Sequence, residues 1–146
     1  MLVREALLPN PLVVSPQTTV LEFCRNVLDS NQTTAAVIDS GQLCGMVSVS
    51  HVFKKILPHY VDMASKLADV IREGYFEEKF NELQHTPVED IMERRSKEMR
   101  PDDSVIKAIA LLSSAEYKTL PVVENGKFVG TITRRSVLRQ VTRSAC

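Results

Sequence analysis

The sequence predicts an α+β protein made of two α/β-type repeats, each with the order β-α-β-β-α. The two repeats are expected to pack sheet to sheet with pseudo-two-fold symmetry, with a helical insertion between them. Three observations predict this fold. The chain resembles itself when it is shifted by 85 residues. Each copy contains a helical pattern followed by two short β-rich runs. A unit of roughly 55 residues buries too little surface alone, so two units must pair.

The repeat is a gapless match between the two halves of the chain. It superimposes several identical residues, among them Pro16 on Pro101, Thr34 on Thr119, Gly41 on Gly126, Gly45 on Gly130 and Val52 on Val137. The repeat units span about 3–57 and 88–142. We therefore expect a first domain at 1–57, an insertion at 58–86 and a second domain at 87–146.

The first unit begins with an extended piece at 12–14, followed by a helix that starts after Thr19. Thr19 and Glu22 have the spacing of a capping box. The apolar residues that follow recur on one helical face, namely Val20, Phe23, Cys24, Val27 and Leu28. Two β-rich runs, AAVID and LCGMVSV, are joined by Ser40-Gly41, and a closing helix is expected from about Ser50.

The second unit repeats this order after an extended piece at 98–100. Its first helix follows an Asp or Ser cap and is expected to bury Val105, Ile106, Ile109 and Leu112. The runs TLPVVE and KFVGTIT are joined by Asn125-Gly126, a strong hairpin signal because both central turn residues need positive φ. The closing helix is expected from about Arg135.

The insertion between the units has a helical, amphipathic pattern, with a break near Gly74. Its apolar residues recur at three- and four-residue steps: Ala64, Leu67, Ala68, Ile71, Tyr75, Phe76, Phe80 and Leu83. Thr86-Pro87-Val88-Glu89 then predicts another helix, with a threonine cap and proline at the first position.

Composition narrows the function classes. With 18 basic and 18 acidic residues the net charge is zero, so no general attraction to nucleic acid or to an anionic membrane is expected. No apolar run reaches the roughly 18 residues of a membrane helix, and the N-terminus lacks a signal-peptide pattern. The three cysteines lack CxxC spacing, which favours free thiols, a cytoplasmic protein and no metal site. No catalytic motif is present, so a non-enzymatic protein is expected.

Both hairpins end in the pattern G-x-x-[ST], as GMVS and GTIT, and each repeat has a proline-led entry from strand to helix. In this pattern and element order the chain resembles a pair of cystathionine-β-synthase (CBS) domains, a tandem called a Bateman module. The resemblance implies regulatory binding of an adenine nucleotide such as AMP, ADP or ATP. It also implies that the hydroxyl, and an Asp three residues later, hold the ribose. Here His51 and Ser136 stand at the two Asp positions. A serine can still make one ribose hydrogen bond.

The resemblance places candidate ligand-binding residues in both units. In the second unit they are Met99, Arg100, Lys118, Thr119, Leu120, Pro121, Thr133, Arg134, Arg135 and Ser136. In the first unit they are Val14, Ser15, Thr34, Ala35, Ala36, Ser48 and His51. Lys118, Arg134 and Arg135 are the candidates for phosphate contacts. The alternatives are that the two arginines are merely solvated and that His51 is a partly exposed residue at a helix start.

Two hypotheses for function follow. The first is a regulatory sensor that binds an adenine nucleotide in the cleft between the repeats and signals to a regulated protein of unknown identity. The second is a ligand-free scaffold for dimerisation or protein interaction, in which the 58–85 insertion docks a partner. The resemblance implies a homodimer in either case.

Overall fold

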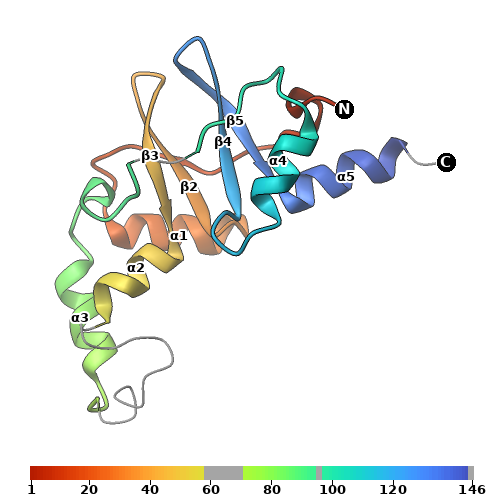
Figure 1. Ribbon diagram of the computed structural model, residues 1–146. Coiled ribbons are helices and arrows are strands. Elements are labelled where there is room, and N and C mark those ends of the chain that lie inside the picture. Colours follow the sequence, from red (N-terminus) through yellow and green to blue (C-terminus); the bar gives the residue numbers. More distant parts are fainter. Residues whose placement is uncertain (58–70, 95–96, 145–146) are drawn as a thin grey trace.

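The computed structural model describes residues 1–57, 71–94 and 97–144, and it has the predicted α+β architecture (Figure 1). The first unit contains strand β1 (Val13–Val14), helix α1 (Val20–Ser30), strands β2 (Thr34–Asp39) and β3 (Gln42–Ser48), and helix α2 (Val49–Ile56). Its three strands form a sheet in the order β1-β2-β3, in which β1 and β2 are parallel and β2 and β3 antiparallel. This order confirms the β-α-β-β-α prediction for the first unit.

The second unit contains helix α4 (Val105–Leu112), strands β4 (Thr119–Glu124) and β5 (Lys127–Thr133), and helix α5 (Arg134–Ser144). β4 and β5 form an antiparallel hairpin. The extended piece at 98–100 forms a single parallel bridge, from Met99 to Val122, where the first unit has β1. The Met99 N–H donates to the Pro121 carbonyl at 2.9 Å, and the Val123 N–H donates to the Met99 carbonyl at 2.8 Å.

The two hairpins match in detail. Thr34 pairs with Ser48 in the first, as Thr119 pairs with Thr133 in the second, and each register shifts once at equivalent points. The predicted turns have positive φ at both central residues, for example 52° at Asn125 and 79° at Gly126. β3 lies against β5, and the Phe128 N–H donates to the Gly41 carbonyl at 3.1 Å, which joins the hairpins to each other.

Short 3-10 helices cross between the units. η1 (Val3–Ala6) belongs to the core of the second unit, and the Leu8 N–H donates to the Thr131 carbonyl at 2.8 Å. η3 (Val88–Asp90) belongs to the core of the first unit, where Val88 is fully buried. Each unit therefore completes its core with the first segment of the other repeat.

Helix α1 buries the predicted face except at its end. Val20 and Phe23 are buried and Cys24 and Val27 pack against the core, but Leu28 is 80% exposed, so the prediction for Leu28 was wrong. In α4, the buried residues are Val105, Ala108 and Leu112, whereas Ile106 is 68% exposed and Ile109 is also exposed. The prediction for Ile106 and Ile109 was wrong, because α4 is apolar on more than one side and periodicity alone did not identify the side that faces the sheet.

The insertion contributes helix α3 (Tyr75–Leu83), which begins after Gly74 at a φ of 88°. Phe80 and Leu83 pack against the core of the first unit, as the amphipathic pattern predicted. Ile71 lies before the helix, and Ala64, Leu67 and Ala68 fall outside the described residues. The helix predicted at 86–89 is only the 3-10 turn η3. Its cap residue is Pro87, without a side-chain cap, so the predicted threonine cap was wrong.

Candidate functional site

The residues at the two G-x-x-[ST] motifs cap the helices that follow them. In the second unit, the Ser136 N–H donates to the Thr133 hydroxyl at 3.0 Å, and the Thr133 N–H donates to the Ser136 hydroxyl at 2.9 Å. In the first unit, the His51 N–H donates to the Ser48 hydroxyl at 3.4 Å, and the Ser48 N–H donates to His51 Nδ1 at 3.0 Å. Both pairs are reciprocal caps, so residues 51 and 136 satisfy backbone donors at their helix starts.

Ser136 is turned into the protein. Its side chain is 3% exposed, and its hydroxyl donates to the Thr133 carbonyl at 3.0 Å besides accepting from the Thr133 N–H. Thr133 is only half-buried, and its hydroxyl uses an acceptor position in the cap. Thr133 therefore keeps a donor for a ligand, whereas the hydrogen-bonding capacity of Ser136 is used within the helix start.

A cavity of about 440 Å³ lies where the two units meet at these helix starts. It brings together five of the predicted second-site residues with Thr34 from the predicted first site: Lys118, Thr119, Thr133, Arg134 and Arg135. Sequence reasoning missed other lining residues, namely Leu8, Pro9, Ser30, Asn31, Gln32 and Arg139, and Thr33 adjoins the predicted Thr34. Arg139 lies one helical turn after Arg135, a spacing that would have identified it. We call this space the junction cavity.

The junction cavity is basic. Four of its lining residues are cationic and none of those among the described residues is acidic, so its potential favours an anion. Arg134 is already engaged: its Nε donates to the Leu112 carbonyl at 2.5 Å and its guanidinium Nη2 to the Ser114 carbonyl at 2.9 Å. These bonds tie the end of α4 to the start of α5. Lys118, Arg135 and Arg139 remain exposed and form no ion pair with the other described residues.

The remaining predicted second-site residues do not line the junction cavity. Met99 and Leu120 are fully buried, and Pro121 is buried beside them in the core. Arg100 is exposed, and its N–H donates to Asp103 Oδ2 at 2.8 Å. These residues belong to the framework of the second unit and do not form part of the described wall of the cavity.

The predicted first-site residues do not converge on one cavity within the part of the chain that the structure describes. Val14, Ala35 and Ala36 are buried in the core, and the Ser15 N–H donates to the Thr18 hydroxyl. The first-unit counterparts of the four cations of the junction cavity are Thr33, Val49, Ser50 and Lys54. The first unit thus has only one of the four positive charges, and the two repeats differ in charge at this position.

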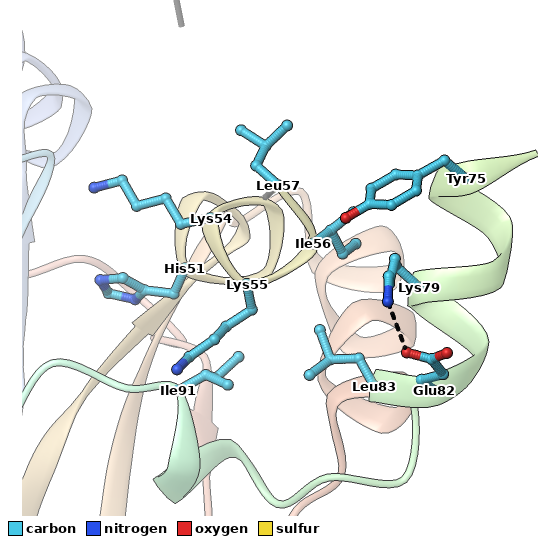
Figure 2. Close-up of a pocket in the computed structure, with 10 residues that line it drawn as sticks. All are labelled: His51, Lys54, Lys55, Ile56, Leu57, Tyr75, Lys79, Glu82, Leu83 and Ile91. Atoms are coloured by element: carbon cyan, nitrogen blue, oxygen red, sulfur yellow. Dashed lines mark hydrogen bonds and ion pairs between the residues drawn. The ribbon is translucent and has the colours of Figure 1, made fainter. Parts of the chain in front are cut away.

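His51 lines a different cavity, of about 680 Å³, between α2 and α3 (Figure 2). Burial lowers the pKa of His51; the nearby Glu93 opposes that shift and Lys54 adds to it. The neutral ring is also required by the cap, because His51 Nδ1 accepts a hydrogen bond from Ser48. The structure therefore supports a neutral, helix-capping histidine.

The described residues contain no group of His, Cys, Asp and Glu side chains arranged to hold a metal ion. Cys24 and Cys44 are free thiols, and burial raises the pKa of Cys24. A search of the described helices found none that is long and apolar enough to cross a bilayer.

The fold and the junction cavity define a tandem-repeat module in which two α+β units meet at a basic cavity. The chain belongs to the CBS domain family, since a sequence model of the CBS domain matches residues 3–58 and 88–143. Pairs of CBS domains are typically regulatory modules that bind nucleotides and are generally non-catalytic.

Several known proteins are similar to this chain. The uncharacterized protein MJ1426 of Methanocaldococcus jannaschii is 28% identical, over 94% of this chain and 89% of its own length. The hypothetical conserved protein GK1048 from Geobacillus kaustophilus is 25% identical, with a TM-score of 0.74, over 99% of this chain and 98% of its own. The structure of CBSX2 in complex with AMP is 24% identical, with a TM-score of 0.73, over 99% of both chains.

Proposed function

We propose that this protein is a regulatory sensor that binds an adenine nucleotide in the junction cavity and transmits occupancy to a partner. The observation that carries the proposal is the set of exposed cations around Thr133, at the point where the two units meet. The volume of about 440 Å³ lies in the range of small-molecule sites. The fold of CBSX2, whose structure contains AMP, supports the choice of an adenine nucleotide.

The cations specify how the nucleotide would bind. Arg135 and Arg139 offer planar donor forks to phosphate oxygens, and Lys118 adds a third charge from the start of β4. The Thr133 hydroxyl can donate to the ribose, whereas no carboxylate is present at position 136 to accept from both ribose hydroxyls. Recognition therefore depends more on phosphate than on ribose.

The mechanism of signalling is a population shift. Residues of both units line the cavity, with Gln32 and Thr34 on one side and Arg135 on the other. A ligand that touches both units stabilises one relative orientation of them. The helices on the outside of the units would transmit this change to the regulated protein.

Titration calorimetry with AMP, ADP and ATP tests the proposal. Arg135→Gln and Arg139→Gln are each expected to weaken binding by about three- to thirtyfold. Arg143→Gln is the matched control, because Arg143 lies one turn further along α5, is exposed and does not line the cavity. No binding at millimolar nucleotide, or binding that both cavity variants leave unchanged, would reject the sensor and favour the ligand-free scaffold.

A homodimer through the second unit is the partner arrangement we propose. Ile106 and Ile109 on α4 and Leu138 and Val141 on α5 are exposed apolar residues, and Leu138 is 60% exposed. The equivalent residue of Val141 in the first unit is Ile56, which is only 4% exposed and lies at the cleft between α2 and α3. The first unit thus covers the position equivalent to Val141, whereas the second unit leaves Val141 exposed beside Leu138, and a second copy is the expected occupant there.

Light scattering after size exclusion tests the dimer. Leu138→Glu is expected to give a monomer, while Val129→Glu, at another exposed apolar residue on β5, keeps the dimer. A monomeric wild-type protein, or a dimer in both variants, would contradict the arrangement.

We also propose a cytoplasmic location, on the basis of the free thiols of Cys24 and Cys44, and cell fractionation checks it.

A further inference from the structure

The cavity between α2 and α3 is separate from the junction cavity and shares no residue with it. Its walls are the two helices, and Ile91, which follows η3, closes one side (Figure 2). α3 belongs to the insertion that follows the first unit. The cavity therefore lies between a helix of the first repeat and a helix of the insertion.

The lining of this cavity combines an apolar base with cationic walls. Ile56 and Ile91 are buried at its base, and Leu83 packs against the same core. Figure 2 shows Lys55 extending from α2 toward Ile91 and Lys79 extending from α3 into the space between the helices. Lys54 also lines the cavity, but it points away from α3.

Lys55 and Lys79 differ in direction and in partners, because Lys55 points toward Ile91 on the side away from α3 (Figure 2). Lys79 Nζ lies 3.4 Å from Glu82 Oε2 and 5.6 Å from the centre of the Tyr75 ring. This ion pair is exposed and weak, so Lys79 can exchange Glu82 for a ligand anion at little cost. Lys55 has no acidic partner among the residues that the structure describes. With three lysines and one glutamate among the described lining residues, the wall has an excess of positive charge.

We infer that this cavity binds a small amphipathic carboxylate, with its apolar body on the base and its carboxylate at the lysine wall, beside Lys79 and within reach of Lys55 once that side chain rotates toward α3. Burial of the apolar body removes hydrocarbon from water, and the two ammonium groups select an anion over a neutral analogue. A monoanion fits better than a phosphate, because the C-terminal end of α2 at Ile56 and Leu57 presents partial negative charge and no arginine lies among the described lining residues. The inference is independent of the nucleotide proposal.

Octanoate is the probe for the test, with 1-octanol as its neutral analogue and inorganic phosphate as an anion without an apolar body. Calorimetry on the full chain is expected to show saturable octanoate binding that exceeds binding of either analogue. Lys55→Gln and Lys79→Gln are each expected to weaken it about three- to tenfold. Lys127→Gln, at an exposed lysine on β5 outside both cavities, is expected to leave it unchanged.

Several results would overturn the inference. These are no saturable octanoate binding at millimolar concentration, equal binding of octanoate and 1-octanol, or octanoate affinity that neither lysine variant changes. Thermal melts of the variants show whether they fold, which is expected because both lysines lie at the surface of their helices. AMP titration of the same variants separates the two sites, because Lys55→Gln and Lys79→Gln should leave nucleotide affinity as it is.

Discussion

Replacement of Gly45 by alanine is expected to destabilise the first unit strongly, because this position has no room for a side chain. A Cβ at residue 45 would lie 2.5 Å from the Glu93 carbonyl oxygen and 2.9 Å from Met92 Sδ. The Glu93 backbone exchanges two hydrogen bonds with Met46, at 3.0 Å and 2.8 Å. Relief of the clash requires this segment to move away by most of an ångström, and both bonds would lengthen.

The expected cost of Gly45→Ala is about 2–4 kcal/mol in the free energy of unfolding. Overpacking contributes about 1–3 kcal/mol and the two weakened hydrogen bonds about 1 kcal/mol each, while the stiffer unfolded chain returns about 0.5–1 kcal/mol. Gly41→Ala is the control in the same hairpin: a Cβ there meets nothing within 4 Å, and only the φ of 80° opposes it. That strain costs about 1–2 kcal/mol.

Urea unfolding followed by circular dichroism measures both values. Hydrogen exchange adds a local readout, since the amides of Met46 and Glu93 should lose protection in Gly45→Ala and keep it in Gly41→Ala. If Gly45→Ala were no more costly than Gly41→Ala, or if both amides stayed protected, the close approach of these segments would not explain the glycine.

Three further predictions concern the helix starts. The lowered pKa of His51 means that the folded state favours the neutral ring. Its stabilising effect is therefore present above the ordinary pKa of about 6.5 and is lost as pH falls through the lower folded value. Urea unfolding at about pH 7.5 and 5.5 should show a larger loss of unfolding free energy at the lower pH in the wild type than in His51→Asn. Arg134→Ala should lower the free energy of unfolding by about 1–2 kcal/mol in the same assay, because two hydrogen bonds to carbonyl groups are lost. Arg135→Ala should change it by less than about 0.5 kcal/mol. Similar losses of unfolding free energy in the two variants would contradict the structural role of Arg134. Ser136→Ala removes the cap and should lower the stability by about 1 kcal/mol, whereas Ser136→Asp should keep the cap and the stability. Thermal melts measure both variants. Equal stability of the wild type and both variants would mean that the cap contributes nothing.

The repeat and the hairpins could be predicted from the sequence because their signals are local. Asn125-Gly126 favours one turn geometry, and the 85-residue shift identified the second turn independently. The buried face of α4 could not be predicted in the same way. Its apolar residues surround the helix, so their pattern does not identify the buried side. Ala108 rather than Ile109 faces the core, because α4 packs in the space between the sheet and η1.

The junction cavity was predicted only in part, because residues distant in sequence form it. The motif at Thr133 and the adjacent arginines located one wall. Leu8 and Pro9 line another part of the cavity because the N-terminal segment crosses to the second unit. No local sequence pattern predicts this crossing. The double contact of Arg134 with the end of α4 also depends on tertiary structure, so the sequence could not separate this arginine from Arg135.

The unequal repeats follow from two separable demands on the same helix start. One demand is a side chain that accepts the backbone N–H of the hydroxyl residue, and both His51 and Ser136 meet it, with acceptor distances of 3.0 Å and 2.9 Å. An acid would meet it too, so loss of the acid leaves the fold intact. The other demand is charge complementary to a ligand, and here the cations of the second unit have no equivalent beyond Lys54 in the first. The two caps therefore remain equivalent, while positive charge is concentrated at the start of α5.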